Sequence, residues 1–189
     1  MANTVSTARQ GRSSTRALLA AYLIVLAWVI LWKLELPYLG GELRVVKLVP
    51  FASDGTSGSS STVEVLINLL LFVPFGMLLA VCAPAWNWLR ALLPIAATSL
   101  ACEVAQYALR LGSSNITDLI VNCAGGAAGF GAARLLARSS AVVAARAARV
   151  LASAFIALAL FFALSPISYA PMGNRPQASA QASPAAFLD

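Results

Sequence analysis

Three acidic residues stand in otherwise apolar segments, and each has a side-chain amide nearby in the sequence. The pairs are Glu64 with Asn68, Glu103 with Gln106, and Asp118 with Asn122. Side chains three or four residues apart lie on the same face of an α-helix. A carboxylate beside an amide offers acceptors and donors to a polar ligand, and it can also act as a general acid or base. These six residues are therefore predicted to form one ligand-binding polar cluster.

Helix capping is the simpler explanation for two of the three acids. Glu64 and Asp118 open predicted helices, where the helix dipole favours negative charge. Glu103 comes late in its helix, where the dipole disfavours an acid. An acid inside a membrane span is costly unless it is paired or used. The candidate charge partners are Arg110 and, in the first loop, Arg44 and Lys47.

Several kinds of chemistry lack their usual residues. The chain has no His, so Ser-His triads, imidazole metal sites and histidine proton relays are excluded. The three cysteines fall inside apolar runs without a CxxC spacing, which favours a packing role. No metal site and no cofactor are predicted.

The elements that must position the cluster are membrane-spanning helices. The chain of 189 residues is 60% hydrophobic and only 11% charged, far from the composition of a soluble domain. About 20 apolar residues in a helix cross a bilayer core of about 30 Å. We predict an all-α membrane protein, a bundle of about five transmembrane helices. The predicted spans are residues 17–36, 62–83, 89–111, 116–137 and 150–164.

This gives four regions along the chain. Residues 1–16 are predicted to be a mobile, basic, cytoplasmic tail, and residues 17–138 a domain of four spans. Residues 139–166 hold the fifth helix, which Arg146 and Arg149 can extend backwards by snorkelling. Residues 167–189 are rich in Pro, Ala, Ser and Gln and are predicted to be a disordered tail.

Basic residues set the predicted orientation. With the N-terminus in the cytoplasm, most Lys and Arg residues lie at cytoplasmic ends, as the positive-inside rule requires. Those residues are Arg9, Arg12, Arg16, Arg90, Arg134, Arg138, Arg146 and Arg149. The polar cluster then faces the outer leaflet. Because the basic residues flank apolar runs, a nucleic-acid partner is rejected.

Glycines in the fourth span indicate close helix packing. Gly125 and Gly129 are four residues apart, which lets another helix approach closely in lipid. That helix belongs either to the same bundle or to a second copy, so a homo-oligomer through Gly125 and Gly129 is a candidate assembly.

Several motifs resemble those of the VanZ-like family. They are LVPF at 48–51, EVLINLLLFVPFG at 64–76, EVAQ at 103–106 and ITDLIVNCAGGAAG at 116–129. The resemblance implies a small protein of the bacterial inner membrane, related to a protein associated with low-level teicoplanin resistance. The chain departs from the family pattern at Lys47, where many members have an amide, and at Ser113–Ser114, where many have an arginine.

Three functional hypotheses follow from different classes. The first is a non-enzymatic modulator whose cluster binds a membrane lipid or lipid-linked envelope precursor at the outer leaflet, affecting glycopeptide susceptibility. The second is an intramembrane enzyme that uses Glu103 or Asp118 as a general acid or base on a lipid-linked substrate. The third is a structural or transporter subunit. Since neither an activated nucleophile nor a metal set is evident, the modulator is favoured and enzymatic activity is left open.

Overall fold

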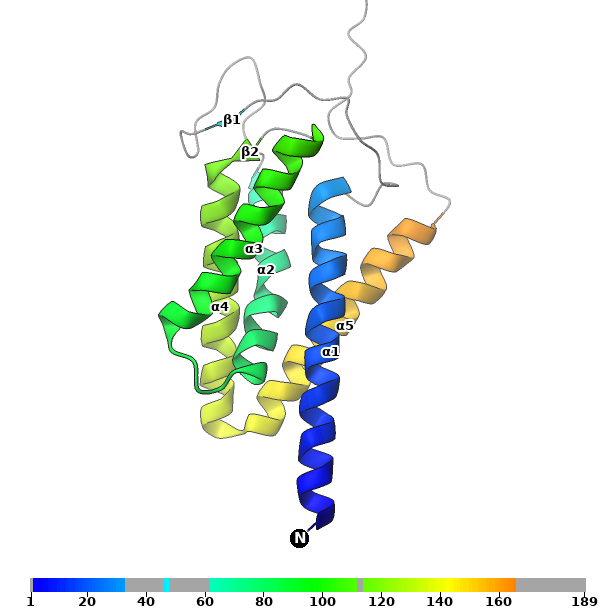
Figure 1. Ribbon diagram of the computed structural model, residues 1–189, viewed down its shortest axis with the longest axis vertical. Helices are drawn as coiled ribbons and strands as arrows, with labels where there is room; N and C mark the ends of the chain where they lie inside the picture. The colour runs from blue at the N-terminus through cyan, green and yellow to red at the C-terminus, as the bar shows by residue number, and fades with distance from the viewer. Residues whose placement is uncertain (1, 33–45, 48–61, 112–113, 166–189) are drawn as a thin grey trace, which may run out of the picture.

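The computed structural model describes residues 2–32, 46–47, 62–111 and 114–165 (Figure 1). These residues form helices and one very short strand pair. The helices are α1 (Ala2–Trp32), α2 (Thr62–Cys82), α3 (Trp88–Leu109), α4 (Ile116–Ser139) and α5 (Ala141–Leu164). The strands are β1 (Val46–Lys47) and β2 (Ser114–Asn115). The predicted all-α class is confirmed.

The helices run alternately up and down (Figure 1). α1 begins at the same end of the bundle as the short connections between α2 and α3 and between α4 and α5; we call this the α1-start end. All five described helices are long and apolar enough to cross a membrane. The predicted number of spans is therefore confirmed for the described part of the chain.

The bounds of the middle helices agree closely with the apolar runs. α2, α3 and α4 each begin or end within two residues of the predicted limits. Asn87 caps α3, because its side chain accepts a hydrogen bond from the backbone N–H of Arg90 at 2.9 Å. Ser140 caps α5 in the same way through Val143. The caps explain why these two helices begin where they do.

The outer helices are longer than the apolar runs. α1 begins at Ala2, whereas the sequence predicts a mobile segment before residue 17. Its apolar part begins at Ser13. A helix that is already formed adds residues more easily than it nucleates, which explains the extension. α5 begins at Ala141, consistent with the predicted backward extension past Arg146 and Arg149.

α2 lies at the centre of the bundle and packs most extensively against α4. The two helices run parallel, and glycines bring their backbones together. A Cβ atom added at Gly125 would collide with the carbonyl oxygen of Leu69, and one at Gly129 with that of Val73. These glycines are therefore occupied by packing within the chain, and a homo-oligomer stays a prediction.

A second contact supports the part of α2 around Pro74. Pro74 lies inside α2 and has no N–H, so one carbonyl of the preceding turn lacks its usual helical donor. The buried Tyr22 hydroxyl on α1 donates a hydrogen bond of 2.6 Å to the backbone oxygen of Leu71 in that turn. A neighbouring helix thus donates to the carbonyl next to that of Leu70, the one that Pro74 leaves without its helical donor.

Much of the outer surface of the bundle is apolar. Leu66 and Leu70 on α2, Leu93 on α3 and Leu158 on α5 are all more than half exposed. In a soluble monomer such a surface would be unusual, whereas in a bilayer it faces lipid.

Candidate functional site

The polar cluster begins with a hydrogen bond between α2 and α4. The Asn68 amide nitrogen donates to an Asp118 carboxylate oxygen at 2.8 Å, in a partly buried position. Asp118 lies in the first turn of α4, where the helix dipole also favours its negative charge. The sequence pairs Asn68 with Glu64 on its own helix, but the structure joins it to the acid of another pair.

A buried polar contact lies deeper, between α3 and α4. The Asn122 amide nitrogen donates to the Ser99 hydroxyl oxygen at 2.9 Å. Ser99 is fully buried and Asn122 is 3% exposed. Among the described residues, the side-chain oxygen of Asn122 has no hydrogen-bond partner. Buried acceptors are usually satisfied, so a water molecule or a ligand is a candidate donor to this oxygen.

Glu103 lies on α3 one helical turn after Ser99, and only 6% of it is exposed. Its burial agrees with the prediction that this acid belongs to the interior of the bundle. An acid at such a position needs compensation from its surroundings, which marks it as a functional candidate. Glu103 and the Ser99–Asn122 contact thus lie one helical turn apart on the buried side of α3.

Gln106 connects the same face of α3 to α1. Its side-chain nitrogen donates to the backbone oxygen of Ile30 at 3.0 Å. This hydrogen bond joins the ends of two spans. The structure therefore gives Gln106 a packing role beside any role in binding.

Glu64 differs from the other acids in its surroundings. It lies in the first turn of α2 and is exposed. Glu64 is therefore accessible at the surface of the bundle, whereas Glu103 is buried within it.

The structure describes only some of the basic residues that were predicted as charge partners. Arg110 is exposed and ends α3 in a left-handed conformation with φ of 55°, where its backbone N–H caps the helix. Lys47 belongs to β1, and Arg44 lies outside the described residues. The pairing of β1 with β2 sets Val46 opposite Ser114. Lys47 and Ser114, which both belong to departures from the family pattern, therefore lie close together in the backbone, next to the start of α4.

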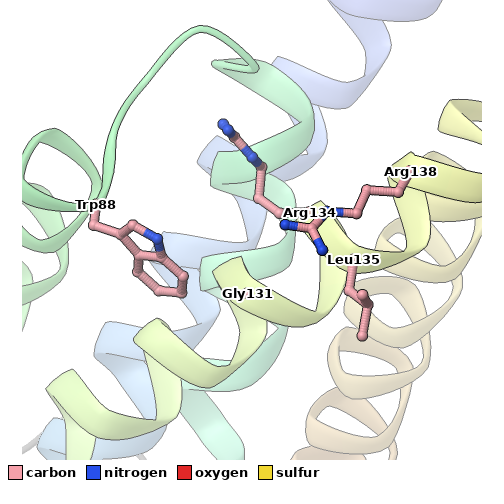
Figure 2. A pocket seen from close by; sticks show the side chains of 5 residues that line it. All are labelled: Trp88, Gly131, Arg134, Leu135 and Arg138. Carbon is pink, nitrogen blue, oxygen red and sulfur yellow. The ribbon is translucent and has the colours of Figure 1, made fainter.

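Two pockets among the described residues lie at the α1-start end, away from the cluster. The first has a volume of about 360 Å³ and is lined by Trp88, Gly131, Arg134, Leu135 and Arg138 (Figure 2). The second, of about 490 Å³, lies between α1, α2, α4 and α5. The predicted cavity between the six cluster residues stays a prediction. Across the described ranges, no three His, Cys, Asp or Glu side chains group to hold a metal ion.

Sequence reasoning missed the hydroxyl residues of the cluster. Ser99 and Thr117 are both buried, at 0% and 1% exposure. Ser and Thr are common in apolar spans, so their presence alone is no signal. The available signal for Ser99 was its spacing of four residues before Glu103, which puts both on one helical face.

These features define a class, namely multi-pass helical membrane proteins with a buried polar cluster among the spans. The sequence model of one family, VanZ/LLP1, matches residues 19–137, more than half of the chain. The chain belongs to this family. It is 34% identical over 123 residues to Protein VanZ of Enterococcus faecium, covering 64% of this chain and 73% of the relative. No solved structure matches the chain.

Proposed function

We propose that this protein modulates glycopeptide susceptibility, teicoplanin above all, by binding a lipid or lipid-linked envelope component within its polar cluster. The observation that carries the proposal is the burial of Glu103 beside the Ser99–Asn122 contact. Burying a polar group in a span costs free energy, and such groups are retained where they bind, conduct or react. The kinship with Protein VanZ supports the link to glycopeptides.

The chemistry of the cluster fits a ligand rich in hydroxyl and amide groups. Glu103 and Asp118 supply carboxylate acceptors. The buried side-chain oxygen of Asn122, which has no partner among the described residues, is a further acceptor. Sugar hydroxyls and peptide N–H groups are donors to such acceptors. A lipid-linked cell-wall precursor carries both, and its lipid tail would lie along the exposed apolar faces of the helices.

The proposed orientation puts the cluster toward the outer leaflet. Arg90, Arg134, Arg138, Arg146 and Arg149 all belong to the α1-start end of the bundle. Cytoplasmic ends of spans carry an excess of Arg and Lys, which favours a cytoplasmic N-terminus. The start of α4, with Asp118, then faces the outside of the cell, in the inner membrane of a bacterium.

Growth of complemented strains tests the proposed function. A strain without its own copy of the gene would express the wild-type chain, Glu103→Gln or Ser99→Ala, with Thr98→Ala as the control beside Ser99. Resistance to teicoplanin should fall to the empty-vector level for Glu103→Gln and decrease for Ser99→Ala, while Thr98→Ala keeps it. Membrane levels of each variant are measured by immunoblot.

Two outcomes would overturn the proposal. If Glu103→Gln reaches the membrane at normal levels and protects as well as the wild type, the buried acid has no part in resistance. If the purified chain converts a labelled lipid-linked precursor to a new product, and Glu103→Gln stops the conversion, the protein is an enzyme and not a binder.

A further inference from the structure

The α1-start end holds a pocket with an unusual lining. Arg16 on α1, Arg134 on α4 and Arg149 on α5 all line the pocket of about 490 Å³. These arginines come from three helices, of which α1 is far from the consecutive helices α4 and α5 in the sequence. None of the residues lining this pocket is an Asp or a Glu. Three cations thus converge on one space without an acid among its walls.

The pocket exists because its other walls are small. Alanines of α4 and α5 form part of its lining, among them Ala137, Ala141 and Ala145. Ala144 and Ala148 are buried in the contact where α5 begins its crossing of the bundle. Larger side chains would fill the space between the helices, so the alanine-rich sequence leaves it open to the three arginines.

Arg134 is fixed in place by the turn before α3. Its Nη1 atom donates to the backbone oxygens of Pro84 at 2.9 Å and Trp86 at 3.0 Å. The guanidinium also lies 5.6 Å from the centre of the Phe130 ring. These contacts use the Nη1 atom and one face of the Arg134 guanidinium. Its other N–H groups can therefore donate to an anion.

The same arginine also belongs to the neighbouring pocket. Figure 2 shows the Trp88 ring beside Gly131, with Arg134 and Arg138 further along α4. A tryptophan ring and arginines at the end of a span are typical of the bilayer interface, where lipid head groups lie. We therefore expect the arginine pocket to open at the depth of lipid phosphates.

We propose that the pocket between Arg16, Arg134 and Arg149 binds the phosphate group of an anionic phospholipid. Guanidinium groups match phosphate oxygens in geometry and charge. The described acids Glu64, Glu103 and Asp118 belong to the opposite part of the bundle, so they do not neutralise these arginines. A lipid phosphate is the anion expected at this end. The bound lipid joins α1, α4 and α5. This site is independent of the proposed function of the polar cluster.

Lipid binding to the purified full-length chain in detergent tests the site. Native mass spectrometry would count bound molecules of phosphatidylglycerol, of phosphatidylcholine and of inorganic phosphate across a concentration series. Arg149→Gln and Arg16→Gln should each weaken phosphatidylglycerol binding by about five- to tenfold, given about 1 kcal/mol or more per arginine. The matched control is Arg146→Gln, on the same helix but outside both pockets, which should leave binding unchanged.

A second pair of variants tests the effect of the space in the pocket separately from the effect of its charge. Ala137→Leu fills the pocket without changing the charge, and its position is exposed enough to accept the larger side chain. It should reduce the binding of phosphatidylglycerol as strongly as Arg149→Gln does. Ala132→Leu, exposed on the same helix and outside the pocket, should not.

Each outcome decides the proposal. Saturable binding of phosphatidylglycerol that is lost in the pocket variants and kept in both controls supports it. Equal binding of phosphatidylcholine, or equal losses in Arg146→Gln and Arg149→Gln, overturns it, because the pocket then does not select the anion. If inorganic phosphate binds as tightly as phosphatidylglycerol, the site recognises phosphate from solution and the lipid is not its ligand.

Discussion

At the scale of single residues, hydrogen bonds between helices hold the polar cluster together. The Asn68–Asp118 bond joins α2 to α4 and the Asn122–Ser99 bond joins α3 to α4, so α4 is tied to two neighbours. Leaving a buried polar group without its partner destabilises a protein more than the bond itself stabilises it. The cluster therefore contributes to folding as well as to any binding.

A double-mutant cycle measures the bond between Asn68 and Asp118. Asn68→Ala, Asp118→Ala and the double variant would be unfolded reversibly in detergent micelles. We expect a coupling free energy of about 0.6 kcal/mol, and up to about 1.7 kcal/mol, which is the range of such bonds between membrane helices. Additive effects of the two single variants would show that the bond makes no net contribution.

Sequence reasoning identified the acids and amides, but it did not give the hydrogen bonds that the amides make to other helices. The three pairs were predicted from spacing along one helix, whereas Asn68 bonds to the acid of α4 and Gln106 to a backbone oxygen of α1. Spacing shows which side chains share a face, but it does not show which helix that face meets. Ser99 was overlooked for the same reason, because its importance comes from Asn122 across the helix contact.

At the scale of elements, the parallel contact of α2 and α4 is the framework of the bundle. Glycines let the two backbones meet, and the same contact places Asn68 next to Asp118. In lipid, close packing of small residues is a main source of helix association, because apolar side chains gain little by leaving the bilayer. The position of the cluster thus depends on glycines one to three turns further along α4.

Substitution of Gly129 tests this dependence. The added Cβ of Gly129→Ala would collide with the backbone oxygen of Val73, which cannot move without moving α2. We expect a loss of about 2 kcal/mol or more in the free energy of unfolding. In Gly131→Ala the Cβ would lie 2.9 Å from a ring atom of Trp88, which is a side chain at the surface and can turn away.

Gly131→Ala is therefore the control and should change stability by less than about 1 kcal/mol. Thermal unfolding of both purified variants, followed by circular dichroism, gives the comparison. Equal stability of the two variants would contradict the close contact of α2 with α4.

The helix bounds were largely predictable because length and apolar content identify a span directly. The start of α1 was not, since polar residues before a span say little about whether the helix continues through them. The contacts between helices could not be predicted either. The spans are apolar on every face, and such helices carry no periodic signal for the side that meets a neighbour.

At the scale of the whole molecule, the two ends of the bundle differ in charge. The α1-start end carries arginines on α3, α4 and α5, and the opposite part holds the buried acid and the amides. This polarity fits a protein that is anchored at one leaflet and binds a ligand from the other.

Cysteine labelling in intact cells tests the orientation. After Cys82, Cys102 and Cys123 are replaced by alanine, one new cysteine is placed by Ala85→Cys at the α1-start end or by Arg110→Cys at the other. A membrane-impermeant maleimide should label Arg110→Cys in intact cells and Ala85→Cys only after the membrane is opened. The reverse pattern would place the N-terminus outside.

The central claim is that the polar cluster binds an envelope component, and an equilibrium binding measurement tests it most directly. The full-length chain in lipid nanodiscs would be titrated with a fluorescent lipid-linked cell-wall precursor. Binding should be saturable for the wild type and for Thr98→Ala, and should be lost in Glu103→Gln, with all three variants equally stable. Equal binding by folded Glu103→Gln and wild type, or no saturable binding by either, would contradict the claim.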